Sequence, residues 1–161
     1  MLENCTTIQE RWNGVDKLVG QLLNERQELL VLYCSLCGVQ PVTKGNDRST
    51  GEGVRSQAKI KRFCAILVDY VSAGHFEVYE QLLREADAFK QDGIGLLARY
   101  YPVIERSTEL AVAFSDKHAD SADTRTLSRD LSRLGESLEA RFEAEDILIE
   151  SLHIANRAQA V

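Results

Sequence analysis

One pair of side chains has the spacing of a metal site in a helical protein. Glu150 and His153 are three residues apart, the Glu-x-x-His spacing by which di-iron helical bundles supply ligands from each of two helices. The sequence holds no second pair, because neither His75 nor His118 follows a glutamate at this distance. We therefore expect no metal centre, and we interpret Glu150 and His153 as exposed polar residues near a helix end.

Two cysteines, Cys34 and Cys37, form a single Cys-x-x-Cys motif. A structural zinc ion needs four ligands, and the sequence offers no second pair. A redox-active pair usually opens a helix that follows a strand, whereas this pair ends a predicted helix. The chain also lacks a glycine-rich phosphate loop and a Gly-x-Ser-x-Gly nucleophile motif. We therefore predict that the protein is not an enzyme and has no cofactor.

The totals indicate one globular domain over residues 1–161 with an acidic surface. The 161 residues are 44% hydrophobic and 27% charged, and their net charge is -6. An acidic chain without a large basic cluster is a poor nucleic-acid binder and favours basic protein partners. We see no secretory leader and no long apolar span, so we expect no membrane contact, a cytoplasmic location and reduced cysteines.

Apolar residues recur at intervals of three and four, which is typical of amphipathic helices, and no period-two alternation indicates strands. Between the first two helical stretches, several glycines, a proline and small polar residues predict a long flexible loop at about 38–53. We expect an all-α fold, an antiparallel up-and-down four-helix bundle with long helices. The helices are predicted at about Thr7–Cys37, Gly53–Lys90, Ile94–His118 and Ala122–Ala158.

Three charged residues interrupt the apolar rows of the first and last helices. Arg26 stands in the row that begins Trp12 and Val19, and Arg141 and Glu145 stand in two rows otherwise made of leucine. Arg141 and Glu145 are four residues apart and can pair on one helix face. Two interpretations stay open. The three residues form a buried ion network that fixes helix register, or they line a polar pocket that opens onto a partner.

A mixed stripe lies on the second predicted helix. At about one hundred degrees per residue, Asp69, Ser72, Phe76, Tyr79 and Glu80 share one face. Aromatic rings beside hydrogen-bonding groups are typical of protein interfaces. The alternative is that the two aromatic residues belong to the core and that the polar ones bond to neighbouring helices.

Two long segments resemble the signatures of a known family. Leu67-Val-Asp-Tyr-Val-Ser-Ala-Gly-His-Phe-Glu-Val-Tyr-Glu-Gln-Leu-Leu83 and Gly135-Glu-Ser-Leu-Glu-Ala-Arg-Phe-Glu-Ala-Glu-Asp146 are similar to segments of the regulator of sigma D family of anti-sigma factors. The N-terminal residues around Trp12 and Arg26 fit the same family. The resemblance covers nearly the whole chain, and it points to a member like the alginate-regulatory homologue of pseudomonads.

The resemblance implies a helical bundle that binds the C-terminal, promoter-recognising domain of the primary sigma factor. Such binding would block both core RNA polymerase and promoter DNA, and it would free polymerase for alternative sigma factors as growth slows. An acidic chain suits this partner, because a helix-turn-helix module that reads DNA is basic. The residues that the resemblance assigns to partner binding are Asp69, Ser72, His75, Phe76, Tyr79, Glu139, Arg141, Phe142 and Asp146, with Arg11, Trp12 and Arg26 added from the N-terminal match.

Other functions stay open beside this one. A metal- or small-ligand-binding bundle would use polar residues such as His75, Glu139 and Glu143. An interaction hub would act on other stress regulators. Any apolar face left exposed would also allow two copies of the chain to associate.

Overall fold

The computed structural model describes residues 8–38 and 51–159. This described part contains five α-helices, a final 3-10 helix and no strand, so the predicted all-α class is confirmed. None of these helices is both long and apolar enough to pass through a membrane. The elements are α1 (Ile8–Leu36), α2 (Gly51–Val71), α3 (Ala73–Ala88), α4 (Gly93–His118), α5 (Leu127–Leu152) and η2 (Ile154–Gln159).

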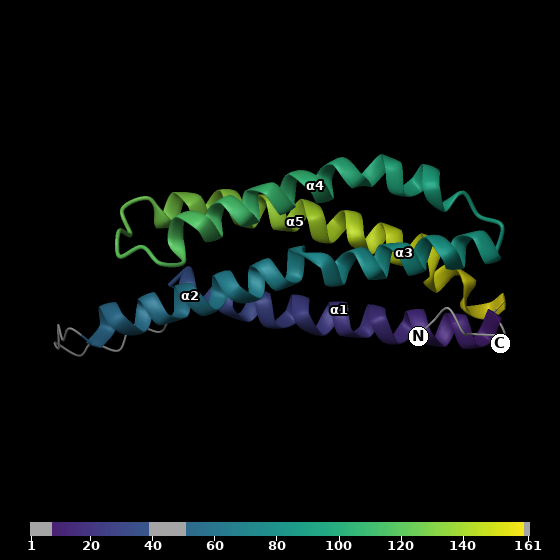
Figure 1. Ribbon diagram of the computed structural model, residues 1–161, viewed down its shortest axis with the longest axis horizontal. Coiled ribbons are helices and arrows are strands. Elements are labelled where there is room, and N and C mark those ends of the chain that lie inside the picture. The colour runs from purple at the N-terminus through teal and green to yellow at the C-terminus, as the bar shows by residue number, and fades with distance from the viewer. Residues whose placement is uncertain (1–7, 39–50, 160–161) are drawn as a thin grey trace.

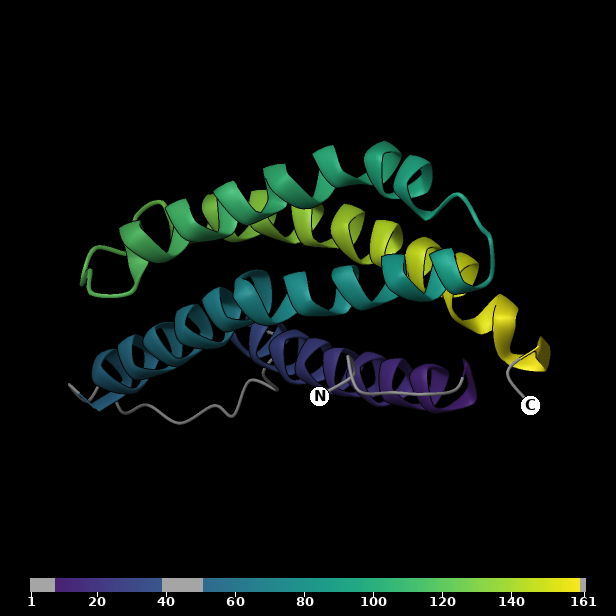
Figure 2. The ribbon, with the colours of Figure 1, turned by 45° about the vertical axis from the view of Figure 1, so that its right-hand side comes forward.

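Along one long axis, α1 and α4 run in one direction and α2, α3 and α5 run in the other (Figures 1 and 2). Helices α2 and α3 follow one another beside α1, and α4 and α5 lie together on the other side of them. Helix α1 packs on α2 and α3, whereas α5 packs on α4 and α3. The backbones of α1 and α5 come close at few points, which leaves an open seam between the first and last long helices.

The single helix predicted from residue 53 to 90 is wrong, because the chain breaks at Ser72. This residue is extended, with φ of -97° and ψ of -157°, and it occupies the N-cap position of α3. Its hydroxyl donates a hydrogen bond to the Asp69 carbonyl at 3.3 Å, near the end of α2. Serine prefers N-cap positions and the nearby Gly74 is a weak helix former, so this segment favours an interruption.

Other predicted boundaries differ less. Helix α4 continues through Pro102. Helix α5 begins at Leu127, five residues after the predicted start at Ala122, and a 3-10 helix replaces its last predicted turn. Most of the predicted loop, residues 39–50, lies outside the described residues, as does Thr7, the predicted start of the first helix.

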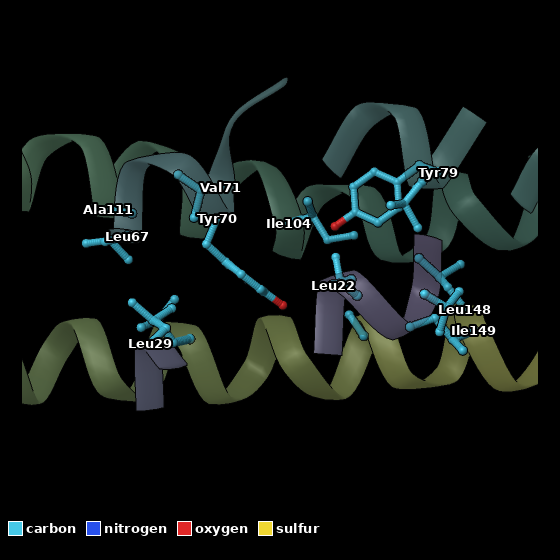
Figure 3. Packing of buried hydrophobic residues seen from close by; sticks show 14 of the residues in the cluster. Leu22, Leu29, Leu67, Tyr70, Val71, Tyr79, Ile104, Ala111, Leu148 and Ile149 are labelled. Atoms are coloured by element: carbon cyan, nitrogen blue, oxygen red, sulfur yellow. The ribbon is translucent and has the colours of Figure 1, made fainter. Parts of the chain in front are cut away.

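Side chains from all five α-helices form one apolar core (Figure 3). Leu29 of α1 and Leu67 of α2 are fully buried, and Leu148 of α5 is 1% exposed. Full burial of a leucine or similar side chain stabilises a fold by about 1.5–3 kcal/mol, so this core is the main source of stability. The tyrosines Tyr70 and Tyr79 point their hydroxyls into the same interior.

One end of the seam between α1 and α5 is closed by a tyrosine that lies over a glycine. The Tyr33 hydroxyl donates to the Leu131 carbonyl of α5 at 2.8 Å. One turn further along α5, Gly135 leaves room for the Tyr33 ring, because a Cβ at this position would overlap the hydroxyl and Cζ of Tyr33. A small residue at 135 is therefore required by this contact rather than by helix propensity.

We expect Gly135→Ala to destabilise the protein by about 1–3 kcal/mol, because the new methyl displaces Tyr33 from its site. Gly20→Ala is the matched control. No side chain lies within 4 Å of a Cβ at Gly20, so alanine there should stabilise α1 by up to about 1 kcal/mol. Urea unfolding measures both. Equal effects of the two substitutions, or a full cost for Gly135→Ala in a Tyr33→Leu background, would contradict the contact.

Candidate functional site

The centre of the molecule holds a buried carboxylate with four donor side chains around it. Glu145 of α5 has no exposed surface. Its Oε1 accepts from Arg141 Nε at 2.8 Å and from the Tyr79 hydroxyl at 2.7 Å. Its Oε2 accepts from Arg26 Nη2 at 3.1 Å and from the Tyr70 hydroxyl at 2.5 Å. The predicted core position of Arg26, Arg141 and Glu145 is therefore confirmed, and of the two interpretations the buried ion network describes them.

Arg141 carries this network to a neighbouring helix. Its Nη1 donates to the Ile104 carbonyl at 3.2 Å, to Ser107 Oγ at 3.0 Å and to Thr108 Oγ1 at 2.8 Å, all on α4. A buried guanidinium is tolerated when its donors are satisfied, as they are here. The network thus joins α1, α2, α3, α4 and α5 at one level.

The two tyrosines act as neutral donors. Burial, followed by the negative charge of Glu145, raises the pKa of Tyr70 and of Tyr79 well above the usual range of a phenol. Both hydroxyls therefore keep their protons and donate to the carboxylate. Tyr79, predicted to bind a partner, is only 6% exposed. The sequence did not predict a polar role for Tyr70, because a tyrosine within an apolar run is typical of a core residue.

Along the seam between α1 and α5 lies a groove of about 710 Å³. One wall is acidic, since four carboxylates of α5 occupy it at spacings of four, three and four residues. Those intervals place them in one row along the helix. The lining residues are Leu30, Tyr33, Gly135, Leu138, Glu139, Phe142, Glu143, Asp146, Ile147 and Glu150.

Arg26 connects the groove to the buried network. Its Nη1 lies 2.6 Å from Asp146 Oδ1 on the groove wall, while its Nη2 binds the buried Glu145. The guanidinium carbon sits 4.8 Å from the centre of the Phe142 ring, a cation–π contact. Phe142 in turn meets Tyr70 edge to face at 5.7 Å. The groove wall is therefore held in place by the same side chains that neutralise the core carboxylate.

The structure places the residues that were expected to bind a partner in different environments. Glu139, Phe142 and Asp146 line the groove, and Arg26 supports it. Arg141 and Tyr79 are buried, and Ser72 is half-buried at the helix break. The groove also contains Leu30, Glu143 and Glu150, which the sequence did not assign to partner binding, although the regular spacing of the α5 acids was a usable signal. The side chains of Arg11, His75 and Phe76 lie outside the described residues.

Asp69 and Trp12 lie away from the groove lining. Asp69 is exposed on α2 near an acidic part of α1. Burial, followed by the charge of Asp69, raises the pKa of Glu25 on α1, which indicates that the two carboxylates are close. Trp12 stacks on the His153 ring with centroids 4.4 Å apart and donates its Nε1 hydrogen to the His153 carbonyl at 3.1 Å.

His153 is buried, so its interpretation as an exposed residue is wrong. Its Nδ1 lies 2.8 Å from Glu85 Oε2 and its Nε2 lies 3.1 Å from Asp16 Oδ1. Both ring nitrogens face carboxylate oxygens, which favours the doubly protonated imidazolium. Burial alone would lower the pKa of His153, but the bonds to Glu85 and Asp16 outweigh it and raise that pKa. The sequence places His153 near a helix end but does not identify its two partners on other helices.

The described residues contain no cluster of three or more His, Cys, Asp or Glu side chains arranged to hold a metal ion. Glu150, the other half of the Glu-x-x-His pair, is exposed on the groove wall while His153 points into the protein. The two side chains of the pair therefore have separate environments and separate contacts.

The family model described as "Regulator of RNA polymerase sigma(70) subunit, Rsd/AlgQ" matches residues 1–153. A "Regulator of sigma D" of Yersinia enterocolitica is 32% identical over 154 residues, covering 93% of this chain and 89% of that protein. A "Regulator of sigma D" of Salmonella paratyphi B is 35% identical over 156 residues, covering 92% and 90%. The chain belongs to the Rsd/AlgQ family of sigma(70) regulators, and the resemblance seen in the sequence is confirmed.

The family description is that of a transcription regulator, in agreement with the expectation that the chain is not an enzyme. These two relatives come from Yersinia and Salmonella, so likeness to the pseudomonad homologue stays a prediction.

We expect Glu145→Ala to cost about 3–5 kcal/mol of unfolding free energy, because it leaves two buried guanidinium groups without their shared carboxylate. Glu143→Ala, two residues away on the exposed groove wall, should change stability by no more than about 0.5 kcal/mol. Urea denaturation of the two variants compares them. A cost below about 1 kcal/mol for Glu145→Ala would show that the network does not depend on this carboxylate.

We also expect stability to fall as pH rises from neutral into the alkaline range. A histidine whose pKa is raised by folding stabilises fully below its unfolded pKa of about 6.5 and loses that contribution as pH passes the folded pKa. Thermal melts between pH 6 and pH 9 test this. His153→Gln should show a weaker loss of stability over this range, and an unchanged profile would contradict the assignment.

Proposed function

We propose that this chain binds the C-terminal, promoter-recognising domain of the primary sigma factor and keeps it from core RNA polymerase and promoter DNA. The family description supports a regulator of sigma(70), and the acidic groove between α1 and α5 supplies a surface for it. The groove carries the proposal, because it contains Glu139, Phe142 and Asp146, three of the residues assigned by resemblance.

The charge of the groove suits a domain that reads DNA. A helix-turn-helix module presents lysines and arginines to phosphates. The row of carboxylates on α5 offers the basic residues of such a module negative groups that can take the place of DNA phosphates. Complementary charge speeds the encounter and selects the partner, and salt screens it. A sigma domain held in this way is unavailable to the promoter.

The buried network adds rigidity to this surface. Phe142 is held between Arg26 and Tyr70, and Asp146 is fixed by Arg26 at 2.6 Å. A contact surface that is already ordered loses less conformational entropy on binding. In this proposal Arg26, Arg141 and Tyr79 position the contact residues rather than touch sigma. Asp69, exposed on α2, is a candidate for a separate contact.

In the cell, the proposed binding would take place in the cytoplasm, where RNA polymerase acts. It would lower the amount of primary sigma factor available and leave polymerase to alternative sigma factors. Neither step needs chemistry on the part of this chain, so the proposal requires only affinity and abundance.

We expect Glu139→Lys/Glu143→Lys to weaken binding to the sigma C-terminal domain by about 10- to 100-fold, since like charges then face each other. Glu105→Lys/Glu109→Lys on α4 makes the same change in net charge away from the groove, where both residues are exposed. Calorimetry at 100 mM salt compares the two variants with the unaltered chain. If the unaltered chain forms no complex with the sigma domain at micromolar concentration, the proposed function is wrong. If both variants lose the same amount of affinity for the sigma domain, the groove is not the binding surface.

A further inference from the structure

The two walls of the groove differ in chemistry. Leu30 lines it on the α1 side and is 38% exposed. Leu23, 42% exposed, lies two turns earlier on the same face of α1, and Val31, 59% exposed, extends the apolar surface outward. The α5 wall carries the row of carboxylates. An occupant that satisfies both walls must be apolar on one side and basic on the other.

The α5 row gives the spacing of the charges. Glu139, Glu143, Asp146 and Glu150 are separated along the helix axis by rises of about 6.0, 4.5 and 6.0 Å, a total of about 16.5 Å. A second helix with basic residues at the same four-three-four intervals reproduces these rises. Three two-residue steps of an extended strand cover about 20 Å and lose register with the row.

The third position of the row differs from the others. Arg26 already pairs with Asp146 at 2.6 Å, whereas no described residue forms an ion pair with Glu139, Glu143 or Glu150. A cation opposite Asp146 would therefore compete with Arg26 and gain little. The other three carboxylates are available to the cations of a partner.

We propose that the groove receives a single amphipathic helix of the partner protein. Its apolar stripe packs on the Leu23 and Leu30 face of α1. Its lysines or arginines meet Glu139, Glu143 and Glu150, and a neutral side chain faces Asp146. Helices bind in grooves in this manner through anchors one turn apart. The identity of the partner rests on the function proposed above, but the shape and charge pattern of the occupant do not.

Nucleic acid does not suit the groove, because its phosphates would meet the carboxylate row. A purely apolar helix would satisfy the α1 wall and leave three carboxylates without counter-charges. The basic amphipathic helix is the occupant that fits both walls.

The probe is a designed 18-residue peptide with a leucine stripe and with lysines at positions matching Glu139, Glu143 and Glu150. The control peptide has the same composition, with its lysines moved onto the leucine face. Fluorescence anisotropy measures affinity at two salt concentrations. We expect the first peptide to bind about tenfold or more tightly than the control.

Protein variants separate the two walls. Glu139→Gln/Glu143→Gln should lower the affinity for the peptide about tenfold and reduce the salt dependence of that affinity. Leu23→Gln/Leu30→Gln should also lower the affinity for the peptide about tenfold, but the salt dependence should remain, because the α1 wall contributes apolar contact rather than charge. Glu105→Gln/Glu109→Gln on α4 is the control and should change neither property. Thermal melts check that each variant is folded, and Leu23→Gln alone serves if the double variant unfolds.

The outcomes distinguish this inference from the proposed function. Equal affinity of the two peptides would overturn the amphipathic occupant. Failure of the peptide while the sigma domain binds through Glu139 and Glu143 would also overturn it and leave the proposed function intact. If the peptide binds but the sigma domain does not, the inference is supported and the proposed function is contradicted. A dimer that becomes monomeric in Leu23→Gln/Leu30→Gln would overturn it in favour of a second copy in the groove.

Discussion

The Glu145 carboxylate is the group whose burial constrains the rest of the structure. An ionised carboxylate without exposed surface is stable only when donors surround it, and here Arg26, Arg141, Tyr70 and Tyr79 supply them from four helices. These donors fix the rotation of α5 about its axis. With Glu145 turned inward, the acidic row that begins at Glu139 must face outward. The core pairing and the surface charge are therefore consequences of the same helix orientation.

The groove exists because α1 and α5 are joined by long side chains rather than by close backbone packing. Tyr33 reaches Leu131 near one end, Arg26 reaches Asp146 in the middle, and Trp12 reaches His153 near the other end. Bridging by large side chains holds the helices together while leaving surface between them open to a partner. In the proposed function this groove serves as the contact site without the movement of an element, and Phe142 and Asp146 are held in place before binding.

Membership of a family of sigma(70) regulators gives this arrangement a function of binding rather than catalysis. In the proposed function, the parts that act are the acidic row of α5, the adjoining apolar face of α1 and the network that holds Phe142 and Asp146. The His153 cluster and the Glu145 network both place charge inside the protein, yet they differ in consequence. The His153 pairs respond to pH near neutrality, whereas the arginine pairs remain charged throughout the physiological range.

The sequence by itself determined the all-helical class, the acidic balance and the core positions of Arg26, Arg141 and Glu145, because a helix imposes a fixed period on its buried face. The family was also readable from two long segments. Ser72 and Gly74 also favour a helix break locally, although the predicted single helix ignored that signal. Tertiary structure alone decided the donation from Tyr70, the burial of His153 and the groove itself. Periodicity shows which face of a helix is buried but not which residues of other helices meet it. Those partners lie far apart in sequence, and only the packing of the helices brings them within hydrogen-bonding distance.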